Sequence, residues 1–236
     1  MLALGIDTST PMVSVALVDK EPLPRSDGPI LTSPPVLVAR CDQLVDNQHG
    51  ELLAALIDEI FKAAGASMAD LGAIGVGLGP GPFTGLRVGI VTAAAISDSL
   101  GIPAYGRCSL DVVGKDHSMD EGPFVVVSDA RRRQLYWAVY NEVGGREEGP
   151  EIGFPQDIAE HVRGRADEVA GPASTLYADA FEGFRIAAPR WPDAESIAQH
   201  AWFPGQAGRA SDPLTPLYLR RPDAREPGPP KRVTPA

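Results

Sequence analysis

The segment with the clearest potential for chemistry is glycine-rich, GVGLGPGPFTGLRVG, and runs from Gly75 to Gly89. Glycine turns expose backbone N–H groups and can bind phosphate. A Walker loop also needs a lysine directly after its last glycine, and the chain has no lysine between Lys62 and Lys115. The dinucleotide fingerprint G-x-G-x-x-G is broken too, because every register ends on proline or threonine. Neither kind of nucleotide loop is predicted.

The histidines do not form a metal-binding pattern. None of the four lies three to five residues from another, so H-x-x-x-H and H-E-x-x-H spacings are absent from the sequence. A metal site needs several converging ligands. We therefore predict no metal site. The four histidines are His49, His117, His161 and His200.

The expected folded region has one basic cluster, within a chain whose net charge is strongly negative. The 236-residue chain has a formal net charge of −10. Because phosphate contacts dominate nucleic-acid affinity, we expect this chain alone to bind tRNA or DNA weakly. Arg131, Arg132 and Arg133 lie at an expected hairpin turn. They form either a solvated tip or a contact for an anionic surface, such as tRNA or an acidic partner.

Cysteine use and hydropathy predict a cytoplasmic protein. Cys41 and Cys108 each lie in a strand-like run, which is typical of buried thiols in a reducing compartment. No apolar run approaches the 18 residues of a membrane span. The N-terminal segment lacks the basic region of a signal peptide and reaches Asp7 early.

Hydrophobic periodicity predicts an α/β protein with two related halves, each opened by a strand–turn–strand unit. We expect residues 1–106 to form an N-terminal lobe, residues 107–221 a C-terminal lobe, and the proline-rich residues 222–236 a disordered tail. Residues 21–36 contain five prolines and are expected to be an extended loop. The expected strands are 2–7, 12–19, 36–41, 73–79, 102–108, 124–129, 134–140 and 168–170. The expected helices are 48–64, 83–100, one starting at 109, 156–163, 174–181 and 194–202.

A stripe of small residues follows the glycine segment into the expected helix 83–100. Gly85, Gly89, Ala93 and Ser97 recur every four residues and so share one side of that helix. A small-residue stripe allows a second backbone to approach closely. It packs either against the sheet of its own lobe or against helices of another subunit, and we favour the second interpretation.

The preceding helix supports the interface hypothesis. Its apolar residues cover an arc of roughly 180°, whereas a core-facing stripe needs little more than 100°. We therefore expect part of this face to contact a partner. The residues assigned to that contact are Leu52, Leu56 and Ile60, with Gly85, Gly89 and Ala93 of the next helix.

Four segments together resemble the bacterial TsaB family. They are IDTST with its following VSVAL strand, GLGPGPFTGLRVG, DARRRQLYWAVY and a late PLYLR, and the resemblance covers roughly residues 1–220. Two details depart from the family pattern. Pro82 stands where serine is usual in GPGSFTGLR, and residues 21–36 replace a shorter hairpin connection.

The resemblance implies a two-lobed actin/sugar-kinase/Hsp70-like fold with mixed sheets flanked by helices. It also implies a catalytically inactive subunit of the complex that adds a threonylcarbamoyl group to adenosine beside the tRNA anticodon. The implied partners are the catalytic subunit TsaD, bound through the first two helices, and the ATPase TsaE. We also expect a homodimer when the chain is alone, tRNA contact only through the complex, and no cofactor except ATP or ADP at the interface with TsaD.

In that fold, Asp7-Thr8-Ser9 occupies the place of the first phosphate loop of actin-like ATPases. Those loops usually carry glycine, and no glycine falls between Asp7 and Asp19. We therefore expect a degenerate nucleotide loop in which Asp7 binds local backbone rather than Mg²⁺. Asp129 has the corresponding place in the second half, and the same expectation applies to it.

These residues are relevant to three candidate functions. A non-catalytic partner subunit is favoured, and we expect the isolated protein neither to hydrolyse ATP nor to make the modified base. An independent ATP-dependent kinase or ATPase of the same fold would need a glycine-bearing phosphate loop. A peptidase would need a metal pair or a nucleophile–base pair, and no motif of the sequence supports either.

Overall fold

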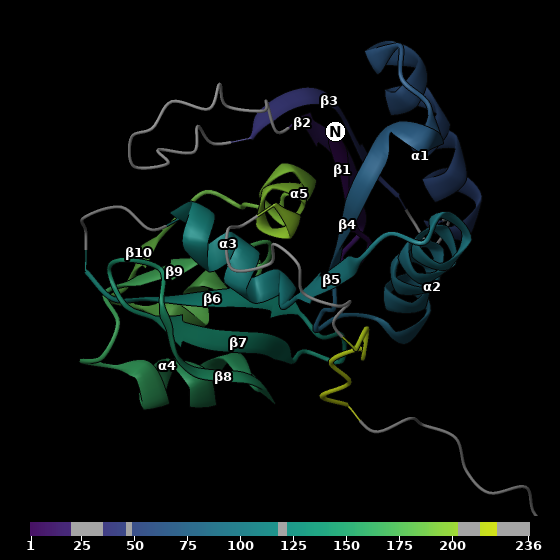
Figure 1. Cartoon of the computed structure of the whole chain (residues 1–236). Coiled ribbons are helices and arrows are strands. Elements are labelled where there is room, and N and C mark those ends of the chain that lie inside the picture. Colours follow the sequence, from purple (N-terminus) through teal and green to yellow (C-terminus); the bar gives the residue numbers. More distant parts are fainter. Residues whose placement is uncertain (20–34, 46–48, 118–121, 203–212, 221–236) are drawn as a thin grey trace, which may run out of the picture.

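The computed structural model describes residues 1–19, 35–45, 49–117, 122–202 and 213–220, which form two mixed sheets with flanking helices (Figure 1). The expected disordered tail and nearly all of the expected proline-rich loop lie outside these residues. No helix among the described residues is both long and apolar enough to cross a membrane.

The first sheet has five strands in the order β3-β2-β1-β4-β5. β1 pairs antiparallel with β2, with Leu4 opposite Leu17, and parallel with β4 on its other side. β1 is the central strand and helices pack on both faces of the sheet, so all six of its residues are buried. The strands are β1 (Leu2–Asp7), β2 (Met12–Asp19), β3 (Val36–Leu44), β4 (Leu71–Gly77) and β5 (Ala104–Arg107).

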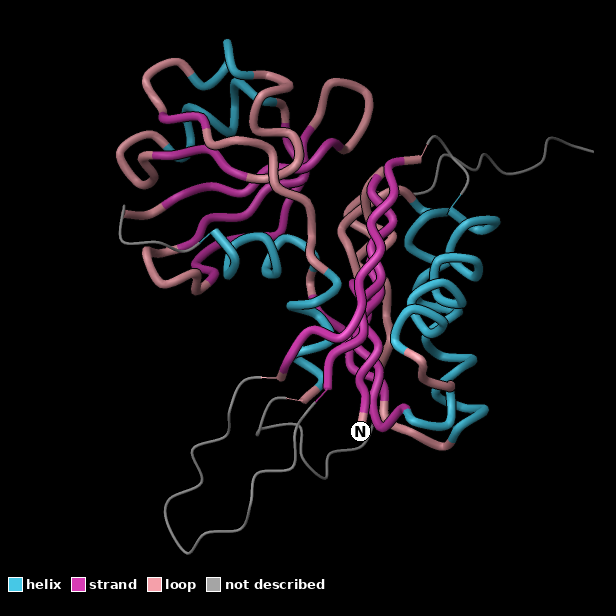
Figure 2. The backbone as a smooth tube through the Cα atoms, turned by 90° about the horizontal axis from the view of Figure 1, so that it is seen from above, coloured by secondary structure: helices cyan, strands magenta, loops and turns pink. Residues whose placement is uncertain are grey.

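Helices cover both faces of this sheet. Helices α1 (His49–Ala64) and α2 (Phe83–Leu100) pack on one face, in a core that contains Leu4 and Ile6 of β1. The short helix α5 (Ala194–Ala201) packs on the opposite face, where Ala198 meets Ala3. Figure 2 shows the first sheet edge on, with the helix pair on the side away from the second lobe.

The second sheet repeats the topology of the first, with order β10-β9-β6-β7-β8. Its two antiparallel pairs, β6–β7 and β7–β8, and its two parallel pairs, β6–β9 and β9–β10, match those of the first sheet. Helices α3 and α4 pack on opposite faces. The elements are β6 (Phe124–Asp129), β7 (Leu135–Tyr140), β8 (Arg146–Gly153), β9 (Glu168–Ala170), β10 (Arg185–Ile186), α3 (Ser109–His117) and α4 (Pro155–Val162). The expected α/β fold with mixed, helix-flanked sheets and two related halves is confirmed.

Several expected elements were wrong or missed. β8 was not predicted, because its charged residues, glycines and Pro150 hide a strand that lies at a sheet edge, where such residues are tolerated. The expected helix 174–181 is only a 3₁₀ turn, Ala178–Phe181, and β10 and the 3₁₀ turn Met68–Asp70 were also missed.

Two expectations about placement also need correction. α5 lies within the range expected for the second lobe, yet it packs on the first sheet, so the chain returns to the first lobe after residue 193. Cys108 is buried as expected, but Cys41 is partly exposed because β3 is an edge strand.

Candidate functional site

The turn after β1 is bound to the glycine segment that follows β4. Thr8 is buried, and its Oγ1 donates to the carbonyl oxygen of Gly85 (2.7 Å) and accepts from the N–H of Gly89 (3.1 Å). One hydroxyl thereby fixes the turn to the first two turns of α2. Because the two bonds span 77 and 81 residues of the chain, they fix the relative position of the turn and α2 in the folded lobe.

Both carboxylate oxygens of Asp7 accept hydrogen bonds from other residues of the chain. Its Oδ1 accepts from the N–H and the Oγ of Ser9, at 2.8 and 2.7 Å. Its Oδ2 accepts from the Oγ of Ser109 at the start of α3, at 2.6 Å. Burial raises the pKa of Asp7, although the hydrogen bonds from Ser109 and Ser9 oppose that shift. The carboxylate is thus an internal link between the start of α3 and the turn after β1.

The glycines are required because this turn approaches the glycine segment so closely. A Cβ on Gly77 would lie 1.9 Å from Oδ2 of Asp7, and one on Gly81 would lie 2.1 Å from the carbonyl oxygen of Ser9. Both distances are far below van der Waals contact. Protein atoms fill the space beside this turn, and this packing explains the small residues of the glycine segment.

The small-residue stripe of α2 faces inward, contrary to the favoured hypothesis. Gly85, Gly89 and Ala93 are all buried, and a Cβ on Gly89 would lie 2.5 Å from Oγ1 of Thr8. The second backbone that the stripe admits is the turn after β1 of the same chain. A periodic pattern cannot distinguish an internal neighbour from an external one, because both require small side chains.

The three assigned residues of α1 also face inward. Leu56 and Ile60 are 3% and 1% exposed and belong to the core of the first lobe, and Leu52 is partly buried against it. The wide apolar arc of α1 is therefore used within the lobe by β2, β3 and α2. Of the six assigned residues only Leu52 keeps partial exposure, so a partner would have to contact mainly other residues of these helices.

The three arginines form the turn between β6 and β7. All three adopt positive φ angles, of 62°, 53° and 59° for Arg131, Arg132 and Arg133. The N–H of Arg131 donates to Oδ1 of Asp129 at 2.9 Å, so Asp129 binds local backbone as expected. The arginines are exposed. Whether they contact an anionic partner stays a prediction.

The structure brings Arg131 to the glycine segment. Arg131, Phe83, Thr84 and His49 all line one cavity of about 240 Å³ where α1 and α2 begin. Beside it, the ring of Phe83 stacks on Tyr218 at 5.0 Å. The sequence did not predict this meeting of segments, because it depends on how the second lobe and the segment 213–220 fold back on the first.

The sequence did not indicate the role of Ser109 in this site. It was predicted only as the N-cap of a helix, whereas its Oγ donates to Asp7 and accepts from the N–H of Gly79 at 3.2 Å. The one available signal was its position just after β5, which ends at the same edge of the sheet as β1. The bond to Asp7 spans 102 residues, and no local pattern contains it.

Comparison with known proteins decides the family. A protein of Mycobacterium tuberculosis that is described as uncharacterized is 41% identical over 224 residues, which cover 94% of this chain and 93% of that protein. The tRNA threonylcarbamoyladenosine biosynthesis protein TsaB of Escherichia coli is 28% identical over 169 residues, or 69% of this chain and 67% of that protein. The chain belongs to the TsaB family.

Two further comparisons agree with this assignment. The family model described as TsaD: tRNA N6-adenosine threonylcarbamoyltransferase matches residues 43–158. Among solved structures, YeaZ from Pseudomonas aeruginosa superposes with a TM-score of 0.73 at 22% identity, covering 92% of this chain and 99% of that one. At that identity the likeness shows the fold alone, and it confirms the expected actin/sugar-kinase/Hsp70-like architecture for this TsaB-family chain.

Proposed function

We propose that this TsaB-family chain is a non-catalytic subunit of the machinery that makes threonylcarbamoyladenosine in tRNA. The observation that carries the proposal is its family membership, together with the name of the E. coli relative as a tRNA threonylcarbamoyladenosine biosynthesis protein. In this proposal a TsaD-type subunit transfers the threonylcarbamoyl group, and a TsaE-type ATPase joins the pair in the cytoplasm.

The packing around Asp7 supports a non-catalytic role. Both carboxylate oxygens of Asp7 already accept hydrogen bonds from Ser9 and Ser109. Thr8 is bound to α2 on both its donor and acceptor sides. Rebuilding a phosphate site here would require breaking these buried bonds, each of which costs about 1–3 kcal/mol when a partner is lost.

The outer face of α2 supports a contact with a TsaD-type partner. Val91 is 62% exposed, and Ala94 and Ala95 beside it are exposed too. On α1, Ala54 and Ala55 are also exposed. We propose that these exposed apolar residues pack on helices of the partner. They replace the residues assigned from the sequence, five of which are buried. The same surface would pair two copies when the chain is alone.

Reconstitution tests the proposal. The purified chain is combined with TsaD-type and TsaE-type subunits, a threonylcarbamoyl donor system and unmodified tRNA, and the modified nucleoside is measured by mass spectrometry. We expect product only when this chain and the TsaD-type subunit are both present, and no ATP turnover by this chain alone. Product without this chain would contradict the proposal, as would ATP turnover by the chain alone above that of Asp7→Ala.

A matched pair of variants tests the contact surface. Val91→Glu places a charge on the outer face of α2, and Val143→Glu places the same charge on a valine of the second lobe that is 75% exposed. We expect Val91→Glu to weaken pairing with the TsaD-type subunit by at least tenfold, about 1.4 kcal/mol, with an unchanged melting temperature. Equal affinity of the two variants, measured by sedimentation, would exclude the α2 face.

In this proposal, nucleotide and tRNA bind only to the assembled complex. We propose that the interface with the TsaD-type subunit is the only place where this chain contacts ATP or ADP. The net charge of −10 supports weak binding of tRNA by this chain alone. Sub-micromolar, salt-sensitive binding of tRNA to the isolated chain at physiological ionic strength would contradict this part.

A further inference from the structure

Exposed aromatic rings and an arginine from three separate segments meet where α2 begins. Phe83, in the first turn of α2, is 45% exposed, and Tyr218, in the segment 213–220, is 41% exposed. Their rings stack with centroids 5.0 Å apart. Arg131, from the turn between β6 and β7, lines the same cavity as Phe83. Both lobes and the C-terminal segment 213–220 therefore build this surface.

Arg87 fixes the two rings but leaves part of Phe83 uncovered. Its guanidinium carbon lies 3.7 Å from the ring centre of Phe83 and 5.9 Å from that of Tyr218, and its Nε donates to the Tyr218 hydroxyl at 2.9 Å. The separation of 5.9 Å is far shorter than the path through the Phe83 ring, so Arg87 and Tyr218 do not sandwich that ring between them. The ring face opposite Arg87 is therefore not closed by Tyr218.

Five guanidinium groups lie on or beside these rings. Arg220 donates to the side-chain oxygen of Gln134 and to the main-chain oxygen of Arg131, which joins the segment 213–220 to the arginine turn. Asp129 pairs with Arg131 at 3.9 Å and offsets one of the charges. The five are Arg87, Arg131, Arg132, Arg133 and Arg220. We call these arginines, with Phe83 and Tyr218, the arginine–aromatic surface.

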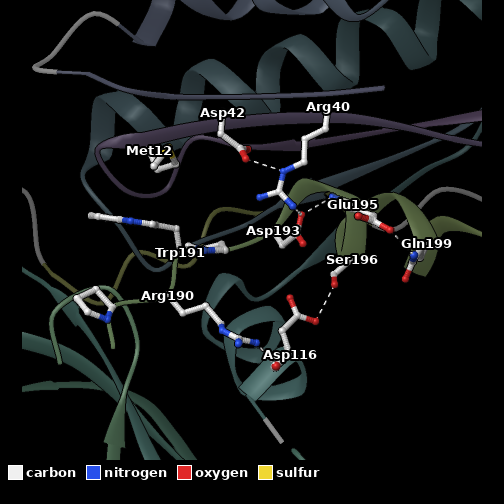
Figure 3. Close-up of a pocket in the computed structure, with 12 residues that line it drawn as sticks. Met12, Arg40, Asp42, Asp116, Arg190, Trp191, Asp193, Glu195, Ser196 and Gln199 are labelled. Carbon is white, nitrogen blue, oxygen red and sulfur yellow. Dashed lines mark hydrogen bonds and ion pairs between the residues drawn. The ribbon is translucent and has the colours of Figure 1, made fainter. Parts of the chain in front are cut away.

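The chain separates positive from negative charge, although its net charge is −10. A cavity of about 520 Å³ beside α5 is lined by four carboxylates and two guanidinium groups (Figure 3). Of the described residues that line the cavity at the start of α1 and α2, Arg131 alone carries a full charge. A polyanion is therefore repelled from the first cavity and attracted to the surface beside the second. The charged residues in Figure 3 are Arg40, Asp42, Asp116, Arg190, Asp193 and Glu195.

Exposed rings among arginines favour RNA over an acidic protein segment as the partner of this surface. Guanidinium groups bind phosphates. Every base has a face that stacks on an aromatic ring, and single-stranded loops of RNA present unstacked bases. An acidic protein segment would use only the positive charges and would leave the rings without a role.

We propose that the arginine–aromatic surface contacts tRNA in the assembled complex, with the arginine turn on phosphates and an unpaired base on Phe83. This inference rests on the subunit role proposed above and adds a direct RNA contact by this chain. Val91, in the proposed contact with the TsaD-type subunit, lies about two helical turns after Phe83. RNA and the protein partner would therefore bind side by side along α2.

Binding of unmodified tRNA to the complex of this chain with the TsaD-type subunit tests the role of charge. The affinity is measured by anisotropy of labelled tRNA at several salt concentrations. We expect Arg133→Gln to reduce the slope of log K against log salt by about 1. Arg163→Gln is the matched control, because Arg163 is also an exposed arginine of the second lobe, at the end of α4. Equal slopes for the two variants would overturn the proposal.

A second pair of variants tests the stacking. Phe83→Leu removes the proposed platform, and Phe154→Leu removes a ring that is 49% exposed at the start of α4. We expect Phe83→Leu to weaken binding of tRNA about tenfold and Phe154→Leu to leave it unchanged. Sedimentation measures pairing with the TsaD-type subunit in parallel. Weakened pairing with unchanged tRNA affinity would show that Phe83 contacts the protein partner instead, and would overturn the proposal.

Cross-linking separates failure of this inference from failure of the subunit role. Unmodified tRNA that carries 4-thiouridine is irradiated with the complex, and cross-linked peptides are identified by mass spectrometry. We expect a cross-link to the peptide of Phe83 or of Tyr218. A complex that makes the modified nucleoside but gives no cross-link to this chain, with tRNA affinity unchanged in Arg133→Gln and Phe83→Leu, would overturn only this inference. A complex that neither binds tRNA nor makes product would overturn both.

Discussion

The two lobes place an aspartate at the same point of the same topology, yet in different environments. Asp7 ends β1 and Asp129 ends β6, and each accepts from the N–H two residues later, at 2.8 and 2.9 Å. Asp7 is fully buried, whereas the side chain of Asp129 is 33% exposed. The local turn is shared. The glycine segment and Ser109 cover it in the first lobe, and the second lobe leaves the corresponding turn open to solvent.

This difference shows how a duplicated fold gives two distinct parts. In the first lobe the turn is part of the core, so its residues hold α2 and α3 in place. In the second lobe the turn presents three arginines to the surrounding solvent. The first turn therefore determines stability, and the second is free to take part in recognition. The following predictions test that division, from the largest expected effect to the smallest.

The largest effect should come from filling the space between α2 and the first turn. Gly89→Leu would drive a side chain into Thr8, because even a Cβ there lies 2.5 Å from Oγ1. We expect the free energy of unfolding to fall by about 3 kcal/mol, the upper part of the usual overpacking range. Urea denaturation measures the change.

Ala94→Leu is the control for this variant, since Ala94 is exposed on the same helix. Alanine and leucine have similar helix propensities, so we expect a change within about 0.5 kcal/mol. Equal stability of the two variants would mean that the small-residue stripe does not face the core.

Removing the two aspartates compares the turns directly. Asp7→Ala leaves the N–H of Ser9 and the hydroxyl of Ser109 without their acceptor in a buried site. We expect a loss of about 2–3 kcal/mol, because buried unsatisfied groups cost about 1–3 kcal/mol each. Asp129→Ala removes one bond in an exposed turn and should cost about 0.5–1 kcal/mol. Equal losses in urea denaturation would contradict the contrast between the lobes.

The burial of Asp7 should also appear in the pH dependence of stability. Because the folded-state pKa of Asp7 is raised, the folded protein holds the proton more tightly than the unfolded chain. The stabilising contribution is therefore complete below the unfolded pKa of about 4 and is lost as pH rises through the folded pKa. Asp7→Asn removes this titration but keeps an acceptor for Ser9. We expect its stability relative to wild type to improve as the pH rises from about 4 through the folded pKa of Asp7; a constant difference would refute the sign.

The smallest effect concerns backbone strain in the open turn. Arg133 has a φ of 59°, a conformation that costs a non-glycine residue roughly 1–2 kcal/mol. Glycine removes this cost but loses more entropy on folding, by about 0.5–1 kcal/mol. We expect Arg133→Gly to stabilise the protein by about 0.5 kcal/mol. Arg163→Gly, at a φ of −59°, should destabilise it instead, and thermal melts of both variants check the opposite signs.

Sequence patterns determined the elements whose hydrophobic periodicity is strong. β1, β2, β6, β9 and α2 were predicted with their observed ends, because alternating or helical apolar patterns and a following turn or glycine mark them locally. The family was also determined at this level, from four segments that a single chain carries in order. β8 and β10 were not predicted. β8 is a polar edge strand and β10 has only two residues, so neither has a clear hydrophobic periodicity.

Only the tertiary structure decided which neighbour each of these segments packs against. The spacing of Gly85, Gly89 and Ala93 correctly predicted a close backbone approach, but the neighbour is the turn at Thr8 and not a second subunit. Asp7 and Ser109 meet across 102 residues, and Asp116 and Asp193 face each other because α5 returns to the first sheet. A local sequence pattern indicates the size and polarity of the side chains that a position accepts. The residues that pack against that position are determined by long-range packing, which no local segment of the sequence encodes.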